Sequence, residues 1–167
     1  MHCNLVQLPK HLRYFTVLQT LLLRTNVMVC CTGLDTLSSS LTHLDLSQNN
    51  LKKFVLPTSL FGLSVSHLFL RELMTKQELF IDRNELTSID GLSAASKLSK
   101  LRLSYNCLTH IPSLESILSS VKELYLNHNL LEGLCSEEAI NGELKVEVFE
   151  ASHNRLQELP ASFIRNG

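Results

Sequence analysis

The amino-acid sequence predicts an α/β fold: a right-handed solenoid with a parallel sheet on its concave face and short helices or 3₁₀ turns on its convex face. Two observations predict it. Leucines recur in a fixed motif with Asn at one position, and the motif returns about every 23 residues along most of the 167-residue chain. Such a period is typical of stacked coils, each of which buries its apolar side against the next coil.

The motif is clearest in two segments that begin at Leu98 and Val121. Numbered from these residues, positions one, four, six, eleven and fourteen are apolar and position nine is Asn. Apolar residues at positions four and six alternate with polar ones, which favours a short strand with one buried face. Each motif therefore predicts one strand, followed by a turn that brings the later leucines into the core.

The Asn at position nine has a structural role. Where the backbone bends after the strand, buried N–H and C=O groups lose their ladder partners, and an amide side chain can replace both. We expect a column of these residues, one in each coil. The column consists of Asn26, Asn49, Asn84, Asn106, Asn129 and Asn154.

The chain is expected to form one domain over residues 1–167. It divides into a partial repeat over 1–17 and repeats that begin at 18, 41, 76, 98, 121 and 146. In the partial repeat, Cys3 occupies the Asn position and Leu5 and Leu8 occupy positions eleven and fourteen, so the chain begins inside a coil. The last repeat ends at Gly167 without a polar capping helix, and we expect the N-terminal part of a longer protein.

The repeat that begins at residue 41 is unusually long, at 35 residues. A segment near Leu68 could form a strand, but the motif restarts only 11 residues later, and a parallel crossover needs a dozen or more. Because the later copy carries Asn84, we assign the strand there. Ser59 to Met74 is then expected to form an outer helix, capped by Thr58 or Ser59. A degenerate strand with an irregular loop is the alternative.

The return legs between strands carry turn signals. Leu34 and Leu37 are three residues apart, which suits a short helical or 3₁₀ turn on the outer face. Pro9, Pro112 and Pro160 each follow position fourteen, where a fixed φ can start the return leg without loss of a ladder N–H.

Composition excludes several classes of partner. The 15 basic and 16 acidic residues give no basic field, so neither direct nucleic-acid binding nor binding to an anionic membrane surface is expected. No apolar run is long enough to span a bilayer. The N-terminus lacks the pattern of a secretory signal, and no Asn-x-Ser/Thr acceptor occurs. We expect an intracellular protein, cytoplasmic or associated with the cytoskeleton.

Five cysteines are an odd number, and Cys3, Cys31 and Cys107 lie on or beside repeat positions. Reduced thiols are therefore expected. Cys30 and Cys31 could form a redox pair, but Cys31 occupies position fourteen of its repeat and suits a small core residue. No cofactor is predicted.

The chain resembles the leucine-rich-repeat family in its Asn-bearing motif and in the segments Ser88 to Leu92 and Ile111 to Ile117. The short intracellular class is the most similar. It includes a nuclear regulatory subunit of protein phosphatase 1, the A-prime protein of the spliceosomal U2 particle and a light chain of axonemal dynein. The resemblance implies that the strands line a concave face that binds other proteins, and it indicates fold far more than partner.

Positions three, five, seven and eight are expected to face solvent on the concave side. In the N-terminal half they include small polar residues such as Thr20, Ser47 and Gln48, whereas three later coils offer aromatic and Arg side chains. Parallel strands lie about 4.8 Å apart, so these side chains should be contiguous. We call them the sheet patch: Phe80, Arg83, Arg102, Tyr105, Tyr125 and His128. Aromatic and Arg residues dominate interface energetics, and the patch is the predicted protein-binding site. The alternative is a stacked cover over a solvated sheet.

Other chemistry has weaker support. His128 and His153 fall in one column, which suggests a metal site that only Glu150 and Asn127 could complete, and no metal is predicted. No Ser, His and Asp combination stands apart from the repeat period, and no glycine-rich phosphate loop occurs.

The sequence therefore predicts a noncatalytic scaffold or adaptor that holds a protein or peptide on its concave face. Cytoskeletal, ciliary and phosphatase-regulatory roles are versions of this hypothesis. Two alternatives remain: a component of an RNA-processing assembly that docks a protein partner, and the recognition arm of an enzyme whose catalytic domain lies downstream.

Overall fold

The computed structural model describes residues 3–34, 41–55, 77–95, 97–135, 140, 144–160 and 163. The elements in these ranges are short and follow the repeats. The strands are β1 (Thr20–Leu22), β2 (His43–Asp45), β3 (Lys53–Val55), β4 (Gln77–Phe80), β5 (Ser88–Asp90), β6 (Leu98–Arg102), β7 (Glu123–Tyr125) and β8 (Val148–Glu150). The 3₁₀ helices are η1 (Lys10–Tyr14), η3 (Leu92–Ala94) and η4 (Leu114–Ser116).

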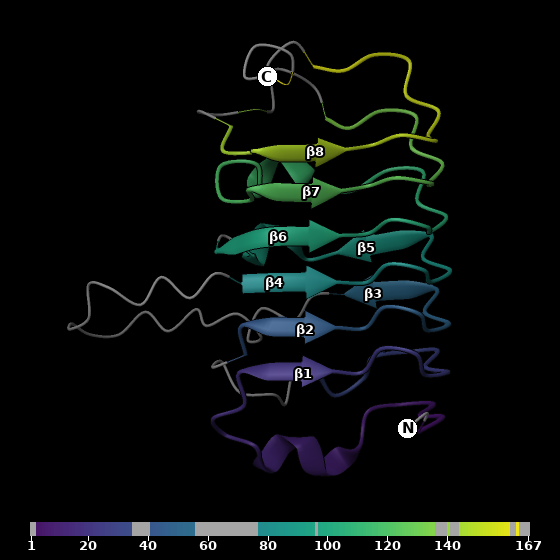
Figure 1. Ribbon diagram of the computed structural model, residues 1–167, viewed down its shortest axis with the longest axis vertical. Coiled ribbons are helices and arrows are strands. Elements are labelled where there is room, and N and C mark those ends of the chain that lie inside the picture. Colours follow the sequence, from purple (N-terminus) through teal and green to yellow (C-terminus); the bar gives the residue numbers. More distant parts are fainter. Residues whose placement is uncertain are drawn as a thin grey trace, which may run out of the picture.

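Six strands form one parallel sheet in the order β1-β2-β4-β6-β7-β8, which climbs the long axis of the molecule (Figure 1). Equivalent motif positions pair from strand to strand, so that Leu44 lies opposite Leu21 and Leu79 opposite Leu44. The direct pairing of β2 with β4 agrees with the strand assignment based on Asn84. The expected outer helix over Ser59 to Met74 lies outside the described residues.

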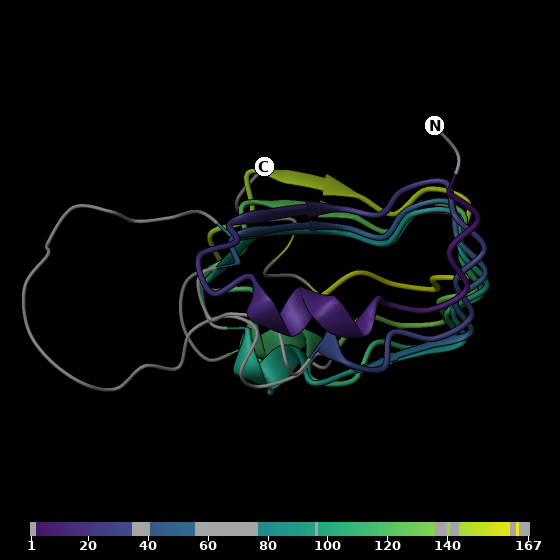
Figure 2. The same cartoon turned by 90° about the horizontal axis from the view of Figure 1, so that it is seen from below.

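The sheet and the 3₁₀ helices lie on opposite sides of the solenoid, with the core between them (Figure 2). Leu101 and Leu103, at positions four and six, are fully buried, as are Leu108 at position eleven and Leu114 in η4. The predicted solenoid, with a parallel sheet on one face and 3₁₀ turns on the other, is therefore confirmed. In the described part of the chain, no helix is both long and apolar enough to cross a membrane.

A second, two-stranded parallel sheet pairs β3 with β5 and was not predicted. Its central residues, Phe54 and Ile89, occupy position fourteen and are buried, so their alternation with less buried neighbours matches the strand period. The sequence predicted only a turn here, because position fourteen was interpreted as a buried core residue and not as part of a strand.

The six Asn side chains form the expected column. Oδ1 of Asn106 accepts the backbone N–H of Leu86 in the preceding coil at 3.0 Å, and its Nδ2 donates to the carbonyls of Leu103 and Ile81. The same pattern recurs from Asn49 to Asn154. Each amide thus joins two coils and satisfies backbone groups that the turn leaves without ladder partners.

The residue before each Asn adopts the left-handed conformation, which the sequence did not predict. These position-eight residues are Thr25, Gln48, Arg83, Tyr105, His128 and His153, with φ between 54° and 60°. L-amino acids with a side chain adopt this region at a cost of about 1–2 kcal/mol. The turn imposes the conformation because it lets the following Asn reach the backbone of two coils.

The β4–β6 pair contains one irregularity. Gln77 lies opposite Leu98, and the next pair is Glu78 with Lys100, so Ser99 is an extra residue in β6. The Ser99 hydroxyl donates to the Gln77 carbonyl at 3.0 Å. The bulge therefore brings the buried Gln77, one residue after the predicted repeat start at 76, into line with Leu98.

Candidate functional site

All six residues of the sheet patch lie on the outer face of the six-stranded sheet. Phe80, Arg102 and Tyr125 are the last residues of β4, β6 and β7, and the strand registers place them side by side. Arg83, Tyr105 and His128 follow three residues later, at the left-handed position. Five of the six, all except His128, border one open cavity of about 440 Å³.

The first row of the patch alternates aromatic rings with a guanidinium. The Arg102 guanidinium carbon lies 5.7 Å from the Phe80 ring centroid and 5.3 Å from that of Tyr125. Lys100 Nζ lies at 5.8 and 5.6 Å from the same two rings. These distances are within the range of cation–π attraction, so the cations and rings hold one another in place.

Asp82 fixes the orientation of Arg102 from below. Its Oδ2 accepts from Arg102 Nε at 2.8 Å, and its Oδ1 accepts from the Ser104 N–H at 2.8 Å. Asp82 is only 7% exposed, and burial raises the pKa of its carboxyl group, although the Arg102 charge opposes that rise. The guanidinium is thus held through Nε, with 46% of the side chain still exposed.

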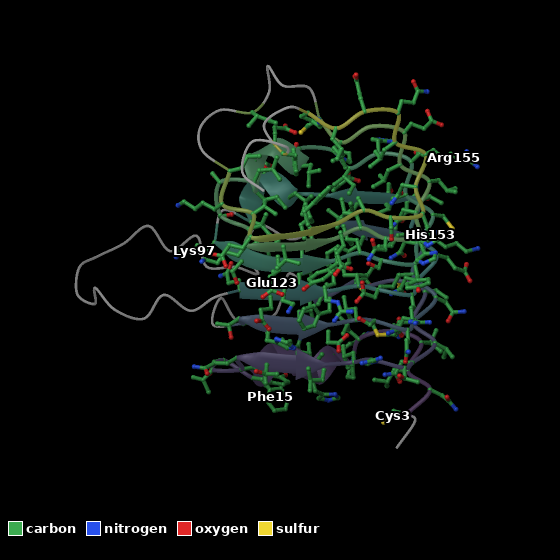
Figure 3. All side chains as sticks on the ribbon, turned by 45° about the horizontal axis from the view of Figure 1, so that its top comes forward. Cys3, Phe15, Lys97, Glu123, His153 and Arg155 are labelled. Carbon is green, nitrogen blue, oxygen red and sulfur yellow. The ribbon has the colours of Figure 1, made fainter. Side chains whose placement is uncertain are left out.

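The second row is a continuous stack at the carboxyl ends of the strands. The Arg83 guanidinium lies 4.5 Å from the Tyr105 ring centroid, and the Tyr105 and His128 centroids are 4.2 Å apart. His153 extends the stack, 4.1 Å from His128. Figure 3 shows His153 at the side where the strands end, away from Glu123. Left-handed backbone at each position directs these side chains into one line.

Neighbouring charges fix the rings of the first row. The Tyr125 hydroxyl donates to Glu123 Oε2 at 3.0 Å, and Lys100 Nζ lies 2.6 Å from the same oxygen. Burial, followed by the Glu123 hydrogen bond, raises the pKa of Tyr125. The His43 ring packs edge-on against Phe80 with centroids 4.9 Å apart, and His43 Nδ1 lies 2.8 Å from Glu78 Oε2. Both rings are therefore held before any partner arrives.

The possible metal ligands have other partners. The His128 and His153 rings are stacked with an interplanar angle of 12°, so their faces are turned toward each other. Asn127 Nδ2 donates to Glu150 Oε2 at 2.6 Å, and Asn127 Oδ1 accepts the Ser152 N–H. Within the described residues, no group of three or more His, Cys, Asp or Glu side chains is arranged to hold a metal ion.

Sequence reasoning missed the supporting residues of the patch, above all Asp82, Lys100 and Glu123. They occupy positions three and seven, which the motif already places on the outer face. A column comparison of these positions would have paired Lys100 with Glu123 on neighbouring strands. Nothing in the pattern indicated that Asp82 is buried, because burial at position seven depends on the side chains that cover it.

Comparisons with known proteins agree with the fold. The family model for the leucine-rich repeat matches residues 40–63. The mouse leucine-rich repeat serine/threonine-protein kinase 1 is 29% identical over 140 residues, which cover 78% of this chain but only 6% of that protein. The chain therefore spans a small fraction of the length of this curated relative.

Two solved structures are similar in fold. A leucine-rich-repeat protein from Leptospira interrogans has a TM-score of 0.65 at 22% identity, over 96% of this chain and 43% of that one. A plant ice-binding protein has a TM-score of 0.52 at 23% identity, over 93% of this chain and 58% of that one. At these identities the likeness concerns the fold alone. Together with the Asn-bearing motif and the parallel sheet, these matches support a leucine-rich-repeat protein.

Proposed function

We propose that this protein binds a protein or peptide partner across the outer, concave face of its sheet, through the sheet patch. The observation that carries the proposal is the clustering of Phe80, Arg83, Arg102, Tyr105 and Tyr125 around one cavity. The leucine-rich-repeat fold is a protein-interaction module in general, which supports a protein partner. The assignment of binding to the outer face of the sheet, and to the residues of the sheet patch, is our own proposal.

The composition and rigidity of the patch support it. Tyr and Arg are the residue types enriched among the side chains that dominate binding free energy. The Arg102 guanidinium and the Tyr125 ring are already held by Asp82 and Glu123, so binding costs little side-chain entropy. A side-chain stack that served only as cover would not need a fixed guanidinium with nearly half of its surface exposed.

The proposed role is that of a noncatalytic scaffold or adaptor, because leucine-rich-repeat domains are typically noncatalytic. The proposed setting is intracellular. The cysteines that the structure describes are free thiols, which fits a reducing compartment. Cytoskeletal and phosphatase-regulatory partners remain versions of this proposal.

A second candidate is a recognition arm within a longer enzyme. The similarity to a protein kinase favours it, since the matched segment is only 6% of that protein. Both candidates use the same binding face, and they differ only in what the rest of the polypeptide does. The sequence of the full-length transcript distinguishes them, since a catalytic domain in the same reading frame would select the second.

Affinity capture followed by quantitative mass spectrometry tests the proposed face. The bait proteins are the wild type, Tyr125→Ala, and Glu115→Ala as a matched control in η4 on the opposite side. A partner identified with the wild type is then measured by calorimetry. Tyr125→Ala should weaken its binding by more than about 1 kcal/mol at unchanged thermal stability, and Glu115→Ala should not. Equal affinity for all three proteins would reject the patch.

A further inference from the structure

Position five of five successive strands carries a symmetrical row of charges and rings. Across the sheet the order is Asp45, Phe80, Arg102, Tyr125 and Glu150, and each residue lies opposite the next in the strand register. All five border the same cavity of about 440 Å³. The cavity thus has a cation at its centre, an aromatic ring on each side of the cation and a carboxylate at each end.

The central cation has capacity for a further acceptor. Asp82 engages Arg102 through Nε, which leaves the terminal guanidinium nitrogens for the cavity side. Arg83 borders the same cavity, packs over Tyr105, and has no carboxylate within 4.0 Å among the described residues. Two guanidinium groups against one buried carboxylate make the centre positive. Arg is the side chain best suited to bind a carboxylate with two hydrogen bonds.

The two end carboxylates are engaged only by neutral groups in the described part of the chain. Asp45 Oδ1 accepts the Ser47 N–H at 2.9 Å, and Glu150 Oε2 accepts from Asn127 at 2.6 Å. Arg24 also borders the cavity, where its Nε contacts Gln48 Oε1 at 3.4 Å, and among the described residues it forms no ion pair with Asp45 within 4.0 Å. Each end is therefore negative and can accept a cation from a partner.

The spacing of the row defines the complementary ligand. Asp45 and Glu150 are each two strands from Arg102, which is about 10 Å at the usual strand separation of about 4.8 Å. In the polyproline II conformation a peptide advances about 3.1 Å per residue with three residues per turn, so every third side chain lies on one face at a spacing of about 9 Å. A chain in this conformation that crosses the strands can thus place every third side chain on one of the three charges.

Building on the proposed function, we propose that the ligand is a segment of another protein in the polyproline II conformation, with the pattern basic-x-x-acidic-x-x-basic. Its acidic side chain lies on Arg102 between the Phe80 and Tyr125 rings, and its basic side chains lie on Asp45 and Glu150. The backbone between the charged side chains passes over the two rings. Because the row is symmetrical, the charges accept the segment in either chain direction.

Three fluorescein-labelled peptides with blocked termini test this pattern by fluorescence polarisation. The first is Lys-Ala-Leu-Glu-Leu-Ala-Lys, the second is its charge inverse Glu-Ala-Leu-Lys-Leu-Ala-Glu, and the third, Lys-Leu-Glu-Ala-Lys-Leu-Ala, has the composition of the first with altered spacing. We expect the first to bind at least about tenfold tighter than either control. Arg102→Gln should abolish the preference, whereas Lys52→Gln, away from the sheet face, should preserve it.

Equal binding of the three peptides, or a preference that survives Arg102→Gln in a folded protein, would overturn the charge pattern. Failure of all three to bind would overturn it too. The proposed function is judged separately by the effect of Tyr125→Ala on the captured partner. If that variant loses the partner while the peptides show no preference, the sheet face binds proteins by another pattern. If neither experiment shows an effect, both proposals are wrong.

Discussion

The side chain of Arg102 is held at the centre of the sheet patch by Asp82, whose Oδ2 lies 2.8 Å from Arg102 Nε. The carboxylate is buried beside the strand ends, whereas the guanidinium remains accessible between two aromatic rings. A fixed cation on an exposed sheet loses less side-chain entropy on binding than a mobile one. The pair therefore relates the repeat architecture directly to the proposed binding site.

Asp82 is predicted to be a positioning residue for Arg102. Asp82→Asn keeps an acceptor for the Ser104 N–H but removes the charge that holds the guanidinium, so the affinity for an acidic ligand should change. Removal of a neighbouring negative charge strengthens the Arg102 field, whereas lost order weakens binding. If positioning dominates, affinity falls by at least about threefold, which is a loss of at least about 0.7 kcal/mol. Calorimetry with the captured partner decides; tighter binding would show that positioning is not the role of Asp82.

Asp82 is also predicted to make stability depend on pH. Its pKa is raised in the folded state above the ordinary value of 3.8. The contribution of Asp82 to the free energy of unfolding is therefore fully present below that ordinary value. It is lost as the pH rises through the folded-state pKa. Relative to Asp82→Asn, the wild type should lose free energy of unfolding from about pH 4 upward. Urea titrations of both proteins between pH 4 and 7 measure this difference. A difference that stays constant or grows with pH would contradict the raised pKa.

The Asn column predicts unequal costs for two adjacent amides. Asn49 is 6% exposed and bonds to backbone groups of two coils, whereas Asn50 is exposed. Asn49→Ala should lower the free energy of unfolding by about 1–3 kcal/mol, because buried backbone groups lose their partner. Asn50→Ala should change it by less than about 0.5 kcal/mol. Urea denaturation measures both, and equal effects would mean that the column is not structural.

The left-handed turn position predicts a stabilising substitution. Thr25 is β-branched and has φ of 60°, a conformation that glycine adopts without a steric cost. Thr25→Gly should raise the free energy of unfolding by up to about 1 kcal/mol. The control is Thr20→Gly in β1, which should lower it by about 0.5–1 kcal/mol. Thermal or urea denaturation checks both signs. A destabilised Thr25→Gly protein would contradict the prediction that relief of strain outweighs the lost hydrogen bond from Thr25 Oγ1 to Gln48 Oε1.

The cysteines are predicted to differ in reactivity. Burial raises the pKa of the Cys31 thiol to about 12, with a smaller effect of Cys30, whereas Cys107 is exposed. The thiolate is the reactive form, so iodoacetamide at neutral pH should label Cys107 quickly and Cys31 only after unfolding. Peptide mass spectrometry measures the two rates. Rapid labelling of Cys31 in the folded protein would revive the hypothesis of a Cys30–Cys31 redox pair.

Much of the architecture could be predicted because one period controls it. The spacing of Leu101, Leu103 and Asn106 fixes which side chains enter the core, and the next copy must then stack in register. The same period predicts that Phe80, Arg102 and Tyr125 share one face of the sheet. The second sheet at Phe54 and Ile89 was missed, since its strands have only three residues each, which is too short a segment for a periodic strand pattern.

The chemistry of the patch was less predictable than its position. Whether Asp82 is buried depends on how Arg102 and the neighbouring strand cover it, which no local pattern encodes. The stacking of Tyr105, His128 and His153 depends on the left-handed backbone at position eight. That conformation is unusual for these residue types and is imposed by the Asn turn.

The central claim is that the outer face of the sheet is the binding face, and photo-crosslinking tests it most directly. Benzoylphenylalanine is incorporated in place of Tyr125 in one protein and in place of Glu115 in another, and each is irradiated with the captured partner. We predict efficient crosslinking from the position of Tyr125 and little from that of Glu115. Crosslinking from the position of Glu115 alone would place the partner on the opposite side of the solenoid and contradict the proposed binding face.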